Sequence, residues 1–217
     1  MSNPILEQGL VVIFRGVPLE KMAPVCKALY RAGVRVMEVA FNPSDENTVE
    51  ATQALIRRAY ESVGDDAFIG AGTVVKKEYV QAAYDAGAKF VYAPDTNVEI
   101  IKETKKLGML SIPGAYTPTE MTTAYNAGAD IVKLFPITVN EIGYIKNIAR
   151  PLSHIPFLCT GGTNEDTIEA FITAGAVGVG TGISILKPEL IEAEDYAEIE
   201  RLAKLHLDRV KEARSKL

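Results

Sequence analysis

The chain has 217 residues, of which 47% are hydrophobic, 24% are charged and 7% are aromatic. These proportions belong to an ordinary globular protein and exclude a disordered chain, a collagen-like repeat and a disulfide scaffold. The net charge of −5, with 23 Lys and Arg against 28 Asp and Glu, argues against nucleic acid as the main partner. A small anion can still bind, because such a site needs only a few local donors.

The N-terminal sequence has no cationic segment, so no signal peptide is expected. The longest uncharged stretch, residues 170–186, contains four glycines and is short for a membrane span, so no membrane partner is expected. Cys26 and Cys159 lie in a helical and a strand pattern, which predicts buried, reduced thiols in a cytoplasmic protein. His154 and His206 have no companion ligands at metal-binding spacing, so no metal site is predicted.

Short apolar segments alternate with helical patterns along almost the whole chain. The eight candidate strands are residues 11–15, 36–41, 68–74, 90–94, 110–115, 131–137, 157–162 and 177–182. Their apolar content is nearly continuous instead of alternating, which is typical of a parallel sheet buried on both faces.

Glycines mark where the intervening helices are expected to end. A glycine after the last helical residue adopts the left-handed conformation that other residues resist. The candidates are Gly33, Gly87, Gly108, Gly128 and Gly175. Capping signals predict helix starts at residues 117–120 and 163–166, and a final amphipathic helix is expected from about residue 194 to the C-terminus.

Eight strand-then-helix units without a linker predict a single (β/α)8 barrel domain over residues 1–217. The chain is shorter than the ~250 residues typical of this fold, so the loops must be short. The main rival is an open doubly wound sheet. That fold more often has a glycine-rich dinucleotide turn after the first strand, whereas residues 15–18 read Arg-Gly-Val-Pro.

Two charged residues lie inside otherwise apolar strands. Lys133 is flanked by Val132 and Leu134, and Glu38 by Met37 and Val39. If the larger apolar side chains of the Glu38 strand pack against helices, strand alternation points Glu38 into the barrel. The pair could be a structural salt bridge, or Lys133 could be a Schiff-base lysine with Glu38 moving protons, since a desolvated amine is a nucleophile toward carbonyls.

Candidate anion-binding groups lie at the predicted strand ends. Arg15 ends the first strand, where a guanidinium suits a carboxylate or phosphate. Glycines follow the seventh strand at 161–162 and the eighth at 180 and 182. Because barrels often bind phosphate at these two loops through backbone N–H groups, the sequence predicts a phosphate site there.

Together these residues resemble the class I aldolases of 2-keto-3-deoxy-6-phosphogluconate (KDPG) and 4-hydroxy-2-oxoglutarate (KHG), which are TIM barrels. The resemblance runs from Val11 to about Tyr196, and the order and spacing of its motifs are specific. The matching stretches are 37–39 (Met-Glu-Val), 70–74 (Gly-Ala-Gly-Thr-Val), 112–114 (Ile-Pro-Gly), 117–120 (Thr-Pro-Thr-Glu), 133–136 (Lys-Leu-Phe-Pro) and 160–162 (Thr-Gly-Gly).

The resemblance implies a role for each matching residue. Lys133 is expected to form the Schiff base and Glu38 to act as general acid and base. Arg15, helped by Asn42, is expected to orient the substrate carboxylate. The pyruvate pocket is expected to consist of Thr73, Pro94, Phe135 and Thr160, and the phosphate site of Gly161, Gly162, Gly182 and Ser184. The resemblance further implies a homotrimer that uses no metal or organic cofactor.

The expected reaction is cleavage of a phosphorylated 2-keto-3-deoxy sugar acid to pyruvate and glyceraldehyde 3-phosphate, with unphosphorylated KHG as a possible substrate. Where gluconate-type enzymes usually carry an arginine, this chain has Asn42, which resembles the galactonate-type branch with its arginine at the end of the first strand. Asp95 and Ile183 also depart from the family pattern. Two alternatives stay open: a phosphosugar epimerase or isomerase that uses Glu38 and Lys133 without a covalent step, and a non-catalytic 2-keto acid binding protein.

Overall fold

The apolar segments of the sequence form nine parallel strands in the computed structural model, which describes residues 3–217. The strands are β1 (Leu10–Phe14), β2 (Val36–Ala40), β3 (Phe68–Gly72), β4 (Phe90–Tyr92), β5 (Leu110–Ile112), β6 (Gly114–Ala115), β7 (Val132–Ile137), β8 (Phe157–Gly161) and β9 (Gly178–Thr181). The expected strand at 110–115 is divided at Pro113, which has no N–H to donate, and the next amide, Gly114, donates to the Asp95 carbonyl at 3.1 Å.

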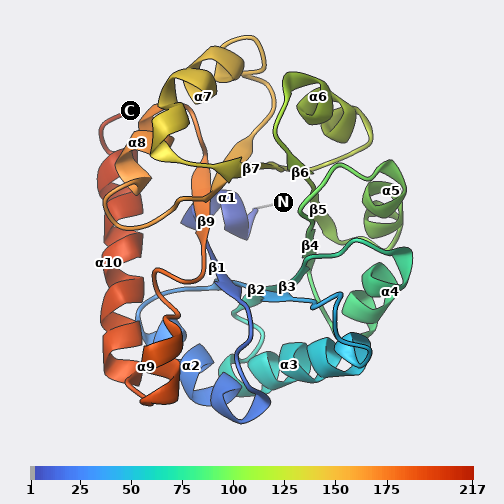
Figure 1. Ribbon diagram of the computed structural model, residues 1–217, viewed down its shortest axis with the longest axis vertical. Helices are drawn as coiled ribbons and strands as arrows, with labels where there is room; N and C mark the ends of the chain where they lie inside the picture. Colours follow the sequence, from blue (N-terminus) through green and yellow to red (C-terminus); the bar gives the residue numbers. More distant parts are fainter. Residues whose placement is uncertain (1–2) are drawn as a thin grey trace.

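The strand order confirms the predicted (β/α)8-type barrel. It runs β5-β4-β3-β2-β1-β9-β8-β7-β6, so the last strand pairs with the first. The two edge strands, β5 and β6, are joined in the chain through Pro113, which makes the barrel nearly closed (Figure 1). An open doubly wound sheet does not place its first and last strands side by side in this sequential order, so the rival fold is wrong.

Helices surround the strands on the outside, except for the first helix, which lies across one end of the barrel (Figure 1). They are α1 (Pro4–Gln8), α2 (Leu19–Arg31), α3 (Thr48–Val63), α4 (Lys77–Asp85), α5 (Val98–Lys106), α6 (Pro118–Asn126), the 3-10 turn η1 (Val139–Glu141), α7 (Ile142–Ala149), α8 (Ile168–Thr173), α9 (Pro188–Glu192) and α10 (Tyr196–Arg214). All five glycines predicted to end helices have positive φ, between 76° and 115°, as a left-handed cap requires.

The two predicted helix starts have different outcomes. Thr117 and Glu120 form the reciprocal capping box at the start of α6. The start expected at 163–166 is wrong, because α8 begins only at Ile168. The Asn164 side chain instead accepts from the amides of Asp166 and Thr167, which stabilises a turn in front of the helix.

The core has two layers. The larger lies between strands and helices and contains Met37, Val39 and Phe41, the apolar side chains that flank Glu38 and Ala40 along the chain. The smaller fills the barrel interior with Ile5, Val11, Val36, Phe90, Tyr92, Ile112, Ile131 and Leu158. Ile5 comes from α1, which lies across one end of the barrel, so the barrel is filled there and can be open only at the other end (Figure 1).

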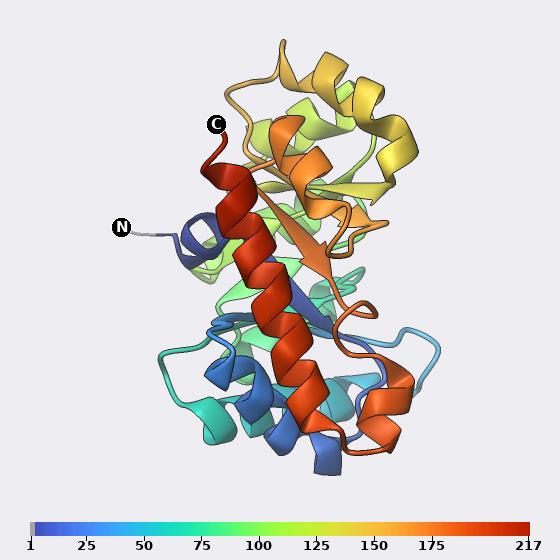
Figure 2. The same ribbon diagram turned by 90° about the vertical axis from the view of Figure 1, so that its left-hand side faces the viewer.

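The C-terminal helix α10 runs along the side of the barrel, and its last turn lies near α1 (Figure 2). Its buried stripe includes Ile199, Leu202, Val210 and Ala213, in keeping with the amphipathic helix expected there, and also His206. Cys26 in α2 and Cys159 in β8 are both buried and unpaired, as expected. Among residues 3–217, no helix is both long and apolar enough to cross a membrane.

Candidate active site

A cavity of about 510 Å³ opens where the strands end. Most of the residues expected in the site line it: Arg15, Glu38, Thr73, Pro94, Lys133, Phe135, Thr160, Gly161 and Gly182. They come from β1, β2, β3, β4, β7, β8 and β9 or from the residue or two that follow each strand. The C-terminal ends of barrel strands are where catalytic groups lie in this fold, since the loops there are free to vary.

Glu38 points into the barrel, as strand alternation predicts. Its side chain is 2% exposed, and Oε2 has no hydrogen-bond partner among the described residues. Room for the carboxylate comes from Gly72 on the neighbouring strand, because a Cβ there would lie 1.0 Å from Glu38 Oε1. A buried carboxylate without a partner is costly, so its retention inside the barrel points to chemistry and not to stability.

Lys133 lies in the same cavity on β7 and is 8% exposed. Its Nζ lies 4.5 Å from the ring centre of Tyr92 and 4.4 Å from that of Phe135. These rings attract the ammonium form and also hold the side chain in place. Among residues 3–217, the ion pairs within 4.0 Å do not include one between Lys133 and Glu38, so the amine is not occupied by a direct salt bridge.

Burial shifts the pKa values of Glu38 and Lys133 in opposite directions. It raises the pKa of the Glu38 carboxyl, against the opposing effects of Lys133 and then Arg15. It lowers the pKa of the Lys133 amine, which Glu38 opposes and Arg15 reinforces. Both shifts favour neutral forms over charged ones, because the cavity solvates charge poorly. The site therefore holds an acid that can carry a proton and an amine that can be a nucleophile near neutral pH.

Arg15 is held at the mouth of the cavity by Thr73. Arg15 Nη2 donates to Thr73 Oγ1 at 3.0 Å. Thr73 directly follows β3 and has φ of 55°, a left-handed conformation that is costly for a threonine. Observed strain of this kind is common at functional sites, and here it places the hydroxyl that orients the guanidinium.

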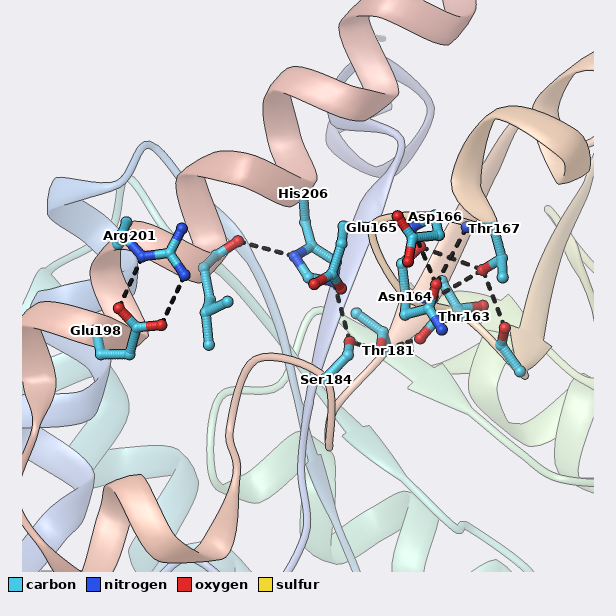
Figure 3. Close-up of polar contacts among 12 residues, drawn as sticks. Thr163, Asn164, Glu165, Asp166, Thr167, Thr181, Ser184, Glu198, Arg201 and His206 are labelled. Carbon is cyan, nitrogen blue, oxygen red and sulfur yellow. Dashed lines mark hydrogen bonds and ion pairs between the residues drawn. The ribbon is translucent and has the colours of Figure 1, made fainter.

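Three expected site residues do not line the cavity. Asn42 is exposed, and its Oδ1 accepts from the Ser44 amide at 3.2 Å. Gly162 donates its amide to the Ile137 carbonyl at 2.8 Å. The Ser184 hydroxyl contacts Thr181 Oγ1 at 2.6 Å and His206 Nε2 at 3.0 Å, behind the loop that follows β9 (Figure 3).

Other lining residues are Gly180 and Ile183, which lie in the glycine loop that the sequence singles out, and Ile13, Thr181, Leu186 and Pro188, which have no distinguishing pattern of their own. The loop glycines around Thr181 are the signal that places it near the site. Tyr92 is a further residue of the site that no motif in the sequence points to. It is fully buried under Lys133, and its hydroxyl bonds Thr160 Oγ1 at 2.5 Å, which fixes a side chain of the cavity wall. A hydroxyl within the apolar strand 90–94 is its only signal in the sequence.

The family model described as "KDPG and KHG aldolase" matches residues 3–202. The chain belongs to the KDPG and KHG aldolase family. It is therefore a carbon–carbon lyase of the aldolase type. Residues 3–217 contain no group of three or more His, Cys, Asp or Glu arranged to hold a metal ion.

Individual aldolases of known sequence or structure agree with this assignment. The 2-dehydro-3-deoxy-6-phosphogalactonate aldolase of Escherichia coli K12 is 32% identical over 180 residues, which are 82% of this chain and 84% of that protein. The KHG/KDPG aldolase of the same organism is 29% identical over 94% of this chain and 93% of its own length. A solved structure described as native KDPGal superposes with a TM-score of 0.84, at 29% identity, over 95% of this chain and 96% of that one.

Proposed function

We propose that this aldolase cleaves a phosphorylated 2-keto-3-deoxy sugar acid to pyruvate and glyceraldehyde 3-phosphate through a Schiff base on Lys133. The observation that carries the proposal is the burial of one amine and one carboxyl, Lys133 and Glu38, in a single cavity at the strand ends. An amine whose pKa is lowered by burial is suited to attack a ketone, and a carboxyl whose pKa is raised can both donate and accept protons.

Lys133 supplies the covalent step. Its neutral amine attacks C2 of the substrate ketone to form a carbinolamine, and loss of water gives the protonated imine. The imine accepts the electron pair of the C3–C4 bond as that bond breaks, which leaves an enamine of pyruvate on Lys133 and releases glyceraldehyde 3-phosphate. Protonation of the enamine carbon and hydrolysis of the imine then free pyruvate and the lysine.

Glu38 moves the protons of this sequence. It donates a proton to the carbinolamine hydroxyl, which leaves as water, removes the proton of the C4 hydroxyl during cleavage and returns a proton to the enamine carbon. Each such transfer is typically worth ~10²–10⁴-fold in rate. The unpartnered Oε2 supports this role, because it leaves one carboxyl oxygen free to contact substrate or water.

The ends of the substrate are proposed to bind at opposite sides of the cavity. Arg15 is available for the carboxylate, since Thr73 holds it at the cavity mouth. The phosphate is proposed to bind where Gly161 and the loop of residues 182–184 meet. In that loop the amides of Ile183 and Ser184 donate to no group among the described residues, so they are free for an anion.

The test of the covalent step is reduction with borohydride in the presence of pyruvate, followed by peptide mass mapping. The expected result is an adduct on the peptide that contains Lys133, and its loss in Lys133→Met. Lys105, which pairs with Asp130 at 2.7 Å outside the cavity, gives the control variant Lys105→Met, which should still form the adduct. No adduct, or an adduct elsewhere, contradicts the proposal.

The substrate that we propose first is the phosphogalactonate epimer. Arg15 in the cavity and Asn in place of arginine at position 42 support it, as does the similarity to the E. coli phosphogalactonate aldolase. Pyruvate release measured with the galactonate and gluconate epimers and with KHG decides between them. A higher kcat/KM for the gluconate epimer, or for KHG, would overturn this choice while leaving the lysine chemistry in place.

The proposed assembly is a homotrimer. Exposed large hydrophobic side chains support it: Tyr116, Tyr125 and Val139 are 38%, 39% and 39% exposed, and the Tyr116 ring stacks on Tyr144 at 5.2 Å. Light scattering should give three times the chain mass of 23.5 kDa, and Tyr125→Glu should shift it toward the monomer. The two unpaired, buried cysteines support a reducing compartment, and we place the enzyme in the cytoplasm.

A further inference from the structure

His206 is a fully buried histidine that the proposed chemistry does not use. It lies on the apolar stripe of α10 and is 0% exposed. Figure 3 shows it facing the loop after β9 and the turn before α8, and its ring reaches Ser184 of the first and Glu165 of the second. Three segments that are distant in sequence therefore meet at one imidazole, directly behind the proposed phosphate loop.

The partners of His206 define its hydrogen positions. Nδ1 lies 2.8 Å from the Leu202 carbonyl, which can only accept, so Nδ1 carries a hydrogen. Nε2 contacts Ser184 Oγ at 3.0 Å. Ser184 Oγ in turn contacts Thr181 Oγ1 at 2.6 Å, and Thr181 Oγ1 donates to the Thr163 carbonyl at 3.0 Å.

With a neutral His206, the series of hydrogen bonds from Leu202 to Thr163 has one hydrogen fewer than its contacts require. The Thr181 hydrogen goes to the Thr163 carbonyl, so the Ser184 hydrogen is required for the contact with Thr181. Ser184 then has only lone pairs to offer Nε2, and the chain is complete when Nε2 also carries a hydrogen. With a neutral ring, Ser184 must donate to Nε2, and the 2.6 Å contact between the two hydroxyls has no hydrogen.

Charged groups around the His206 ring act on its pKa in both directions. Glu165 Oε2 lies 3.6 Å from Nε2 and favours the imidazolium, whereas Lys187 opposes it. Burial is the largest effect and lowers the pKa of His206, while the Leu202 carbonyl and Glu165 partly offset it. A dianionic phosphate near Ser184 would be a second negative group beside Glu165 and would favour the protonated ring.

We propose that His206 is a positioning residue for the phosphate end of the substrate, which it serves by holding Ser184 and by taking up a proton when the phosphate binds. The imidazolium donates to Ser184 Oγ, so the Ser184 hydrogen can serve the contact with Thr181, and the completed series of hydrogen bonds holds the loop of residues 182–184 with its Ile183 and Ser184 amides free for the phosphate. No bond is formed or broken other than the N–H bond to the proton from solvent. The inference rests on the proposed phosphate loop and deepens it.

The experiment compares kcat and KM for the phosphorylated substrate and for unphosphorylated KHG in the wild type, His206→Leu and His206→Gln. His206→Leu is expected to raise KM for the phosphorylated substrate about tenfold, the size of one lost hydrogen bond to a charged group, with kcat and the KHG constants within about twofold. His206→Gln is expected to restore part of the loss, because its amide can donate to Ser184.

A pH series from 5.5 to 8.5 separates positioning from mere packing. The wild-type advantage in KM over His206→Gln should be largest at low pH and decrease as pH rises, because only the wild-type ring titrates. The titration of the phosphate itself is common to both proteins and cancels in the ratio. A ratio that does not change with pH would overturn the role of the imidazolium.

Controls make the outcomes distinguishable. Ser184→Ala is expected to raise KM for the phosphorylated substrate as His206→Leu does, and combining the two should add little further. Lys204→Gln, on the exposed face of α10 where Lys204 pairs with Asp208, should match the wild type. If Ser184→Ala alone has the effect, the inference fails and the phosphate loop stands. If the wild type itself shows no preference for the phosphorylated substrate, the phosphate loop fails and the inference falls with it.

Discussion

Gly72 shows that the position of the Glu38 carboxyl depends on the small size of a neighbouring residue. The Glu38 carboxyl occupies the space that a side chain at position 72 would take. Gly180 serves Tyr92 and Thr160 in a similar way, because a Cβ there would lie 2.5 Å from the tyrosine hydroxyl and 2.6 Å from the threonine hydroxyl. These strand glycines weaken β-strands in general, and here they make space inside the barrel for polar groups.

Gly72→Ala is therefore expected to displace Glu38 and to lower kcat about 10²-fold or more, the usual contribution of a general acid–base group. Steady-state kinetics measures the loss, and circular dichroism checks that the barrel still forms. The matched control is Gly143→Ala in α7, where a Cβ meets nothing within 4 Å. The Gly143→Ala control should keep its kcat and gain about 0.5–1 kcal/mol of stability. A Gly72→Ala variant with wild-type kcat would contradict the proposed role of Glu38.

At the scale of elements, the first and last helices, α1 and α10, close the barrel on the side opposite the cavity. Arg214 in the last turn of α10 donates to the carbonyls of Leu6 and Glu7 at 2.8 Å each, and also to the Val177 carbonyl. It thereby ties α10 to α1 and to the residue before β9. Since α1 supplies Ile5 to the barrel interior, this clamp holds the floor on which the inner core packs.

Arg214→Lys should destabilise the protein by about 1.5–3 kcal/mol, because a single ammonium cannot reach three carbonyls and charge-assisted bonds are lost. Urea unfolding measures the change, and kcat/KM should stay near the wild-type value because the clamp is remote from Lys133. The matched control is Arg209→Lys, an exposed residue of the same helix that pairs with Glu212 at 3.0 Å and should change stability by less than about 0.5 kcal/mol. A loss of activity with unchanged stability would contradict this function of Arg214.

At the scale of the whole molecule, the active site lowers the stability of the fold. Burial raises the pKa of Glu38 from an ordinary value of 4.5, so the protonated carboxyl is favoured in the folded state. This contribution of Glu38 to stability is fully present below pH 4.5 and is lost as pH rises through the folded-state pKa. Burial lowers the pKa of Lys133 from 10.5, so the neutral amine is favoured in the folded state. This contribution of Lys133 to stability is fully present above pH 10.5 and is lost as pH falls through the folded-state pKa. Between these limits both groups destabilise the folded state, because burial penalises their charged forms.

The double variant Glu38→Gln/Lys133→Met should accordingly be inactive and more stable than the wild type at pH 7, by about 1–2 kcal/mol. Its advantage should be smaller at pH 4.5, where the wild-type Glu38 is largely protonated when folded. Urea unfolding at both pH values measures the difference. The exposed pair Lys204–Asp208, changed to Met and Asn, is the control, and an equal or negative gain of the active-site variant at pH 7 would refute the expectation.

The sequence by itself determined the barrel and the position of its two ionisable catalytic candidates. Local rules predict the apolar strands, the glycines that end helices and the inward face of β2. They suffice because alternation along a strand and left-handed helix caps involve only neighbouring residues. Lys133 and Glu38 stand out for the same reason, since each charge interrupts a single apolar strand.

Only the tertiary structure decided which polar groups meet. Tyr92 and Thr160 are 68 residues apart, and Ser184 and His206 are 22 apart, yet each pair shares a hydrogen bond. Asn42 has the strand parity expected of a site residue, but it follows β2 and its side chain turns back to the loop. Hydrogen bonds are short-ranged and directional, so side-chain partners depend on how distant elements pack, which no local pattern of residues encodes.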